Sequence, residues 1–313
     1  MASRIHDCGI MLEPQLGMSM GQLVGTAKLA EDLGFGYVFR SDHVIPTNDK
    51  RGMDSPECWT SLGVIAEATR RISFGPLVSP IGFRNPALLA KMACTLHSHS
   101  KGRLQLAIGA GWYEAEYRAY GYPFPDFKGR LAQFREALDI ITAMAREGRV
   151  DYDGKFFSAH TDCYPRPEGP LHLIIGARTK SLVRLAGTKA DEWNFFNLPV
   201  EVYQELWGVL NASAQGRQVE VSLMTPYMVG KNQSDLEASA KIQVSKLGQN
   251  YSPSELLERL HARNAPCGTV DDFVEQVRGI LDSGVQKIYF QTLVPENKTM
   301  VELLADTLRH RVG

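Results

Sequence analysis

The 313-residue chain lacks the features that mark several classes of protein. Lys and Arg number 34 and Asp and Glu number 35, so the net charge is -1. This balance gives no overall attraction to nucleic acid or to an anionic membrane. No apolar run approaches the roughly 20 residues of a membrane-spanning helix. We therefore expect neither a nucleic-acid partner nor a membrane partner.

Secretion signals and cysteine-based sites are also missing. The N-terminus, MASRIHDCGIML, has no long apolar segment behind its basic residue, so it does not resemble a secretory signal. The 5 cysteines are far apart and form no C-x-x-C pair. The pattern HSHS at 97–100 stands at the end of a predicted helix with no third ligand nearby. The sequence thus predicts a cytoplasmic protein with reduced thiols and no metal site.

Short β-type runs alternate with helical patterns almost from end to end. Eight runs predict strands: 8–12, 36–40, 72–79, 103–109, 171–175, 191–196, 219–229 and 286–293. Apolar residues at helical spacing predict helices at 19–33, 58–70, 86–97, 129–147, 179–187, 199–214, 234–247, 270–282 and 300–311. Gly34 follows the first helix, where a C-terminal capping glycine is common.

Eight strands that are each followed by a helix predict a closed (β/α)₈ barrel, a TIM barrel, as a single domain over residues 1–313. A barrel of this kind needs about 250 residues, so part of the chain must be inserted. The segments 112–128, 150–170 and roughly 248–269 fit as insertions, and the second contains a D-G hairpin turn at Asp153–Gly154. An open doubly wound sheet remains the alternative architecture.

Polar residues follow the second strand in YVFRSDHVIP, residues 37–46. Active sites of TIM barrels lie at the carboxyl ends of the strands, and Asp42 and His43 occupy such a place. A histidine titrates near neutral pH and can move a proton during catalysis. The alternatives are a solvated strand end and a histidine with a structural role.

Two glycine-rich turns follow other strands. GAGWYE, 109–114, has Glu114 where a dinucleotide fingerprint needs its third glycine, so it favours close approach of a flat ligand, or else a plain tight turn. IIGARTKS, 174–181, opens a helix next to Arg178 and Lys180. Free N–H groups at a helix N-terminus bind phosphate, so this turn predicts a phosphate site, with ordinary helix capping as the alternative.

The segment RISFGPLVSPIGFRNPALLAKMACTLHSHSKGRLQLAIGAGWYEAEYRAYGYPFP, 71–125, closely resembles the bacterial luciferase-like monooxygenase superfamily. Within it, the match is best to the branch of deazaflavin (coenzyme F420)-dependent oxidoreductases. RSDHVIP (40–46), ECWTSLGVIAEATRRI (57–72) and HLIIGARTKSLVRLAGTKADEWN (172–194) match in the same order. The resemblance implies a luciferase-type TIM barrel, usually a homodimer, that moves hydride or activates oxygen at a flavin or deazaflavin.

The resemblance also implies site residues. It places Asp42 and His43 beside the reactive face of the cofactor ring as catalytic residues. It implies a bulge or a non-proline cis peptide near Pro76–Leu77 behind the ring, with Val78 and Ser79 following. The remaining cofactor contacts that it implies are Gly111 and Trp112 along the tail, and Gly176, Ala177, Arg178 and Ser181 at the phosphate.

The sequence departs from the family pattern at two positions. Trp112 stands where some deazaflavin dehydrogenases carry a catalytic glutamate, and Pro76 stands where a small residue is common. The expected cofactor is nevertheless coenzyme F420, because the cations Arg40, Arg84, Arg178 and Lys180 would suit its anionic ring and tail. An FMN-dependent monooxygenase and a cofactor-free binding protein remain alternatives. The small-molecule substrate cannot be identified from the sequence.

Overall fold

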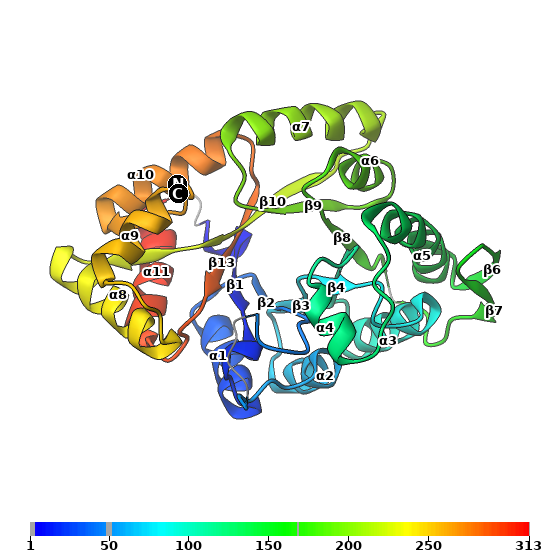
Figure 1. Cartoon of the computed structure of the whole chain (residues 1–313), viewed down its shortest axis with the longest axis horizontal. Helices are drawn as coiled ribbons and strands as arrows, with labels where there is room; N and C mark the ends of the chain where they lie inside the picture. The colour runs from blue at the N-terminus through cyan, green and yellow to red at the C-terminus, as the bar shows by residue number, and fades with distance from the viewer. Residues whose placement is uncertain (1–3, 48–51, 168, 313) are drawn as a thin grey trace.

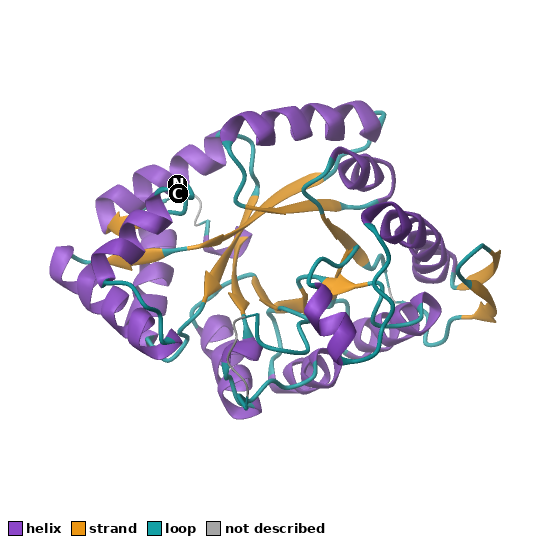
Figure 2. Cartoon of the chain, viewed as in Figure 1, coloured by secondary structure: helices purple, strands orange, loops and turns teal. Residues whose placement is uncertain are grey.

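A ring of parallel strands surrounded by helices forms the body of the protein (Figures 1 and 2). The computed structural model describes residues 4–47, 52–167 and 169–312. The strands of the ring are β1 (Cys8–Leu12), β2 (Tyr37–Arg40), β3 (Ser73–Pro76), β4 (Ser79–Pro80), β5 (Gln105–Gly109), β8 (His172–Gly176), β9 (Glu192–Phe196), β10 (Glu220–Pro226) and β13 (Lys287–Thr292). The helices that follow them are α1 (Met20–Asp32), α2 (Cys58–Ala68), α3 (Pro86–His99), α5 (Phe127–Glu147), α6 (Lys180–Lys189), α7 (Val200–Ala214), α8 (Gln233–Leu247), α10 (Val270–Asp282) and α11 (Lys298–His310).

The sheet closes on itself. Its strand order is β3-β2-β1-β13-β10-β9-β8-β5-β4, and its two end strands, β3 and β4, are successive parts of one extended run. Ser79 and Pro80 of β4 pair with β5, and Phe74 of β3 forms a bridge to Leu104 just before β5. The predicted (β/α)₈ barrel is therefore confirmed, and the open doubly wound sheet is excluded.

Two predicted strands are interrupted in the structure. The run 72–79 divides into β3 and β4 around a non-proline cis peptide between Leu77 and Val78, one bond later than the position expected near Pro76–Leu77. The run 219–229 divides into β10 and β11 (Met228–Gly230), and β11 pairs with β12 (Cys267–Thr269) outside the barrel. Apolar residues continue across both breaks, so hydrophobic pattern alone could not locate them.

Local sequence signals explain where the helices begin. Ser19 and Gln22 form a reciprocal capping box at the start of α1. Asn85 accepts hydrogen bonds from the first turn of α3, and Pro86 occupies the first helical position. In α5 the apolar side chains recur on one buried face, including Leu131, Phe134, Leu138, Ile141 and Met144. These helices bury apolar stripes against the outside of the ring, which positions the strand ends.

The three predicted insertions contain structure of their own. Residues 112–128 include α4 (Glu114–Ala119), and 248–269 include α9 (Pro253–His261) and β12. The segment 150–170, apart from residue 168, which lies outside the described residues, forms most of a hairpin of β6 (Arg149–Asp153) and β7 (Ser158–Asp162). The D-G turn is confirmed, since Gly154 donates to the carbonyl of Phe157 across it.

Five buried free cysteines agree with the expectation of reduced thiols that pack as small apolar groups. In the part of the chain that the structure describes, none of the helices combines the length and the apolar character needed to cross a membrane.

Candidate active site

His43 lies just beyond the carboxyl end of β2, where TIM barrels keep their chemistry. Its Nδ1 atom is 3.0 Å and 3.1 Å from the two carboxylate oxygens of Glu116. The same carboxylate accepts a hydrogen bond of 3.3 Å from the backbone N–H of Val44. Glu116 belongs to α4, within the insertion after β5, and only 1% of it is exposed. A buried carboxylate is thus hydrogen-bonded to one ring nitrogen of an imidazole at the barrel mouth.

The surroundings of His43 favour its charged form. Burial lowers the pKa of the imidazole, but the hydrogen bond and the negative charge of Glu116 outweigh burial and raise the pKa above its usual value. Glu13 and Asp42 add smaller contributions in the same direction. The rings of Trp112 and Tyr113 stand edge-on to the imidazole, with centroids 5.7 Å and 6.2 Å away. His43 is therefore suited to give up a proton near neutral pH.

A second carboxylate, Glu13, follows β1 at the same end of the barrel. It accepts hydrogen bonds from the side-chain amides of Gln15, at 2.6 Å, and Gln291. The buried amide of Gln15 in turn accepts from the Ser41 hydroxyl at 2.6 Å. This chain of hydrogen bonds fixes the Glu13 carboxylate next to the segment that carries His43.

Asp42 is adjacent to His43 in sequence, but its side chain contacts a different set of residues. Its carboxylate accepts 2.6 Å hydrogen bonds from the Ser79 hydroxyl and from Arg84, which also donates a second bond at 3.1 Å. Burial lowers the pKa of the Arg84 guanidinium, but the charge and hydrogen bonds of the Asp42 carboxylate outweigh burial and raise it. The Trp59 indole completes the group by donating to Ser79. These contacts join β2, β4 and α2 beneath the mouth.

Val78, between β3 and β4, is enclosed by two glycines, and we name this arrangement the glycine cradle. A Cβ atom added to Gly109 would lie 2.6 Å from one Val78 methyl carbon, and one added to Gly176 would lie 2.7 Å from the other. Real Cβ atoms do not approach this closely, so both positions need glycine while valine stands at 78. Val78 packs on the apolar cluster inside the barrel and forms part of its upper layer.

The glycine cradle makes a direct prediction. Gly109→Ala is expected to lower the free energy of unfolding by about 1–3 kcal/mol, because the new methyl group overlaps Val78. Adding Val78→Ala is expected to restore much of this loss, since the Cβ of Val78 lies 3.7 Å from the added atom. Urea denaturation of the single and double variants measures both effects.

A control for this prediction lies in α1. Apart from the backbone of its own helix, no described heavy atom lies within 4 Å of a Cβ built on Gly25, so Gly25→Ala is expected to leave stability equal or slightly higher. A double variant as unstable as Gly109→Ala alone would contradict the proposed steric cause.

The turn after β8 presents an uncapped helix N-terminus. Thr179 stands at the N-cap of α6 but makes no side-chain capping bond, so ordinary capping does not account for the turn. The backbone of the turn is held at Ala177, whose N–H donates to Asn194 O at 2.9 Å and whose carbonyl accepts from the Trp193 indole at 3.0 Å. Arg178 is exposed beside this turn. Free N–H groups next to an exposed guanidinium can bind a phosphate.

Three of the four predicted mouth cations are bound to other groups of the chain. Arg40 is only 1% exposed, and it donates to Ser41 O, Pro56 O and the Ser61 hydroxyl. The prediction that it offers charge at an open mouth is therefore wrong, because the side chain points into the packing between β2 and α2. Arg84 is bound to Asp42 and Glu57. Lys180 is exposed and pairs with Glu205 on the surface.

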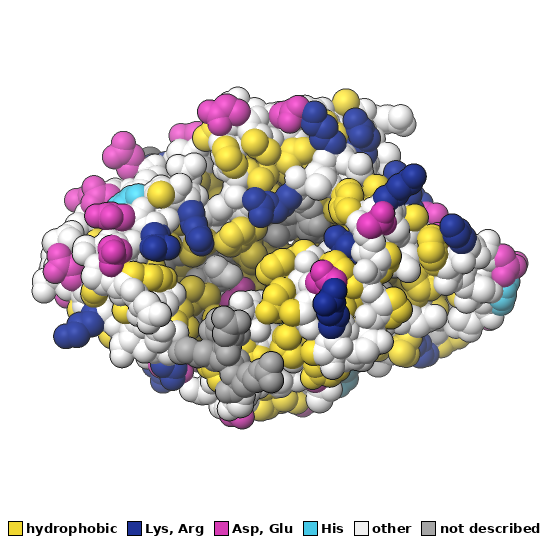
Figure 3. All heavy atoms as spheres, in the orientation of Figure 1, with side chains coloured by type: hydrophobic (Ala, Val, Ile, Leu, Met, Phe, Trp, Pro, Cys, Tyr) yellow, Lys and Arg dark blue, Asp and Glu magenta, His cyan; other side chains and the backbone are white. Residues whose placement is uncertain are grey.

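The remaining predicted residues lie around these features. Pro76 ends β3 in register with Arg40, and Leu77 lies in the apolar cluster inside the barrel. Gly111 has a φ of +78°, and a Cβ there would lie 2.1 Å from the Tyr117 hydroxyl. Trp112 is 67% exposed beside His43, and Ser181 lies in the first turn of α6. Figure 3 looks onto this end of the barrel and shows a hollow bordered by hydrophobic side chains.

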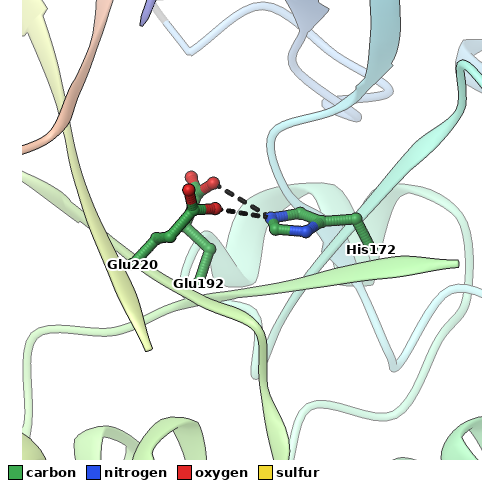
Figure 4. Close-up of side chains that lie close together, drawn as sticks. All are labelled: His172, Glu192 and Glu220. Atoms are coloured by element: carbon green, nitrogen blue, oxygen red, sulfur yellow. Dashed lines mark hydrogen bonds and ion pairs between the residues drawn. The ribbon is translucent and has the colours of Figure 1, made fainter. Parts of the chain in front are cut away.

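A polar cluster occupies the opposite end, and we name it the basal cluster: His172, Glu192, Glu220 and Lys287. Each is the first residue of its strand, so parallel pairing brings them together at the amino ends. Figure 4 shows both carboxylates facing one ring nitrogen of His172, at 3.1 Å and 3.5 Å. These ligand atoms lie within 4.8 Å of one another, as in a metal site, but the Lys287 ammonium contacts Glu192 at 2.9 Å and Glu220 at 2.7 Å. We assign the basal cluster to ion pairing.

The sequence and the fold of the chain are similar to those of several known proteins. The F420-dependent glucose-6-phosphate dehydrogenase of Beutenbergia cavernae is 31% identical over 234 residues, which cover 74% of this chain and 64% of the relative. The chain spans between about half and two thirds of the length of the first curated relatives that it matches.

Solved structures share the fold at low sequence identity. An F420-dependent secondary alcohol dehydrogenase, solved with an F420-acetone adduct, aligns with a TM-score of 0.80 at 18% identity and 98% coverage of both chains. Monooxygenase RslO1 from Streptomyces bottropensis aligns with a TM-score of 0.82 at 20% identity over 96% of this chain and 98% of that one. Residues 6–287 match the family described as luciferase-like monooxygenase. The chain belongs to the luciferase-like monooxygenase family.

Proposed function

We propose that the protein is an oxidoreductase that transfers a hydride between coenzyme F420 and a small organic substrate. The observation that carries the proposal is the His43–Glu116 pair at the barrel mouth, a proton-transfer group held by a buried carboxylate. Relatives that bear the name F420-dependent glucose-6-phosphate dehydrogenase support the choice of cofactor.

The chain offers groups that fit such a cofactor. The uncapped N-terminus of α6, with Gly176, Ala177, Arg178 and Ser181, is proposed to hold the phosphate. The segment Pro76, Leu77, Val78 and Ser79 is proposed to support the ring, because the glycine cradle leaves room for Val78 at the carboxyl ends of β5 and β8. Gly111 and Trp112 are proposed to lie along the tail.

Each polar group then has a defined task. Bound coenzyme F420 supplies the site that accepts or releases hydride. His43 moves the substrate proton, and Glu116 holds its ring. Asp42, which was predicted as a catalytic partner, is proposed to act by fixing the end of β2 through Ser79 and Arg84. Glu13 presents a second polar group to the substrate.

An FMN-dependent monooxygenase is the second candidate, because the matching family is described as luciferase-like monooxygenase. The burial of Arg40 and the pairing of Arg84 reduce the number of cations available to a long anionic tail. Arg178 remains as an exposed cation beside the phosphate turn. With few cations available for the tail, the protein is proposed to distinguish the two cofactors mainly through its contacts with the ring.

The test is a side-by-side titration of purified protein with coenzyme F420 and with FMN at matched ionic strength. F420 is expected to bind at least about tenfold tighter, a difference of about 1.4 kcal/mol. Arg178→Ala is expected to weaken F420 binding and to reduce its salt dependence. FMN binding of equal or greater affinity, with oxygen consumption when reduced FMN is supplied, would establish the monooxygenase. Binding of neither cofactor would favour a cofactor-free binding protein.

We further propose that the chain acts as one domain over residues 1–313 in a cytoplasmic homodimer. Exposed Val64 on α2 and Leu88 on the neighbouring α3 support a surface that a second copy could cover. The expected partner otherwise is the small-molecule substrate, and a net charge of -1 supports the absence of a nucleic-acid partner.

A further inference from the structure

Glu116 is a buried acid whose contacts are directed to one segment. It lies on α4, only 1% exposed, and its oxygens contact His43 Nδ1 and the backbone N–H of Val44. Both contacts belong to the segment after β2, although α4 follows β5. The carboxylate therefore ties the insertion 112–128 to the residue that we propose for proton transfer.

We infer that Glu116 is the positioning residue of the site: it keeps a proton on Nδ1 of His43, so that Nε2 is the atom that exchanges a proton with the substrate. A carboxylate accepts hydrogen bonds and cannot donate one when ionised. Both of its oxygens lie within 3.1 Å of Nδ1, so that nitrogen must carry the hydrogen. The neutral ring is then left with its lone pair on Nε2.

This arrangement defines the proton step. During substrate reduction, for which bound reduced deazaflavin would supply the hydride, the Nε2–H bond of the His43 imidazolium breaks as a new O–H or N–H bond forms on the substrate. The bonding pair stays on Nε2, the ring becomes neutral, and Nδ1–H remains bonded to Glu116. Solvent then restores the proton on Nε2. Oxidation of a substrate runs the same step in reverse.

The other titratable groups near His43 have different contacts from those of Glu116. Glu13 acts on the imidazole through its charge, and its carboxylate accepts hydrogen bonds from Gln15 and Gln291. Asp42 is bound to Ser79 and Arg84. Tyr113 approaches edge-on at 6.2 Å. Among the described residues that act on His43, Glu116 is the one that is hydrogen-bonded to the ring.

The first experiment measures the His43 ring by NMR in the cofactor-free protein labelled with ¹⁵N-histidine. His43 is assigned by comparison with a His43→Gln sample. Glu116→Gln keeps the shape of the side chain and removes its charge, so it is expected to lower the pKa of His43 by about one unit or more. An unchanged His43 pKa in this variant overturns the inference.

The matched control is Glu114→Gln. Glu114 is two residues away on the same helix, half exposed, and paired with Arg118 at 2.7 Å. It is expected to leave the pKa of His43 unchanged. An equal decrease in both variants would point to a general effect of charge on α4 and would likewise overturn the specific role of Glu116.

A second measurement needs no variant, in case Glu116→Gln fails to fold. Above its pKa, wild-type His43 is expected to show the ¹⁵N shifts of a ring protonated on Nδ1. A neutral ring protonated on Nε2 overturns the inference.

Kinetics form a third readout, which rests on the proposed function. In the reductive direction activity should fall as pH rises through the pKa of His43, and Glu116→Gln should move this limb to lower pH and reduce kcat more than it changes KM. Failure to bind any deazaflavin would remove the proposed function, while the two NMR results would still decide the role of Glu116.

Discussion

Replacement of His43 with alanine is expected to lower turnover by about 10²–10⁴-fold, the usual contribution of a general acid or base. The affinity for coenzyme F420 is expected to stay within a few fold, since the proposed phosphate contacts lie at α6 and not at His43. Turnover is expected to fall while cofactor affinity is kept, because the substitution removes the group that exchanges the proton and leaves the Glu116 carboxylate in place. Turnover is followed by deazaflavin absorbance, with a substrate on which the wild-type protein acts.

His99→Ala provides the matched control for this measurement. His99 lies in the last turn of α3, is half exposed, and pairs with Glu67 at 3.2 Å. Its loss is expected to leave turnover unchanged. A His43→Ala protein within threefold of wild-type turnover, with the same pH profile, would remove His43 from the proton step.

Replacement of Glu192 with alanine is expected to lower the free energy of unfolding by about 3–5 kcal/mol, the cost of leaving a buried charge without its partner. Glu192 is fully buried and bonds Lys287 at 2.9 Å, the Tyr289 hydroxyl at 2.9 Å and the Ser222 hydroxyl at 2.5 Å. Lys287 is itself buried, and the carboxylate that it would retain, Glu220, is half exposed. Denaturant unfolding measures the loss.

The control is Glu220→Gln, which removes the other carboxylate from the same lysine. Because its side chain is 43% exposed, the expected loss is at most about 1 kcal/mol. Equal effects of the two substitutions would show that burial of Glu192 does not control the stability of the basal cluster.

The basal cluster also predicts a pH dependence of stability. Burial raises the pKa of Glu192, but the hydrogen bond from His172 and the charge of Lys287 lower it to about 2, from an ordinary value of 4.5. A group with a depressed pKa stabilises the fold above its unfolded value, and this contribution disappears as pH falls from 4.5 towards 2. Glu192→Gln should flatten the stability curve in that range.

Repeated local signals made the barrel predictable. Apolar runs separated by amphipathic helices, with Ser19 and Asn85 at helix starts, identify the order of elements independently of distant contacts. The hydrophobic pattern could not locate the breaks at Leu77–Val78 and Tyr227, because buried apolar residues continue through them, and the first was expected near Pro76–Leu77 from the family resemblance alone. These breaks depend on pairing with β5 and β12, which a local pattern does not contain.

The candidate site shows the same limit. His43 could be selected because it follows a strand, but Glu116 was missed, since it lies 73 residues away on a short helix within a segment interpreted only as an insertion. GAGWYEAE contains two glutamates, and the sequence does not show which of them contacts His43. Arg84 was assigned to the cofactor because its partner Asp42 lies 42 residues earlier. Ion pairs across loops are set by the closed barrel, and a single sequence does not reveal them.

The glycine cradle has a consequence for how ligand preference could diverge within such a scaffold. Val78 lies between β3 and β4, outside the paired residues of the ladder. Its size is limited by Gly109 and Gly176 on the two facing strands. A smaller residue at 78 would permit a larger one at 109 or 176. The total side-chain volume at the bottom of the barrel mouth would stay the same, but its position would change. Three positions could thus reshape the pocket by exchange of methyl groups while the barrel keeps its register.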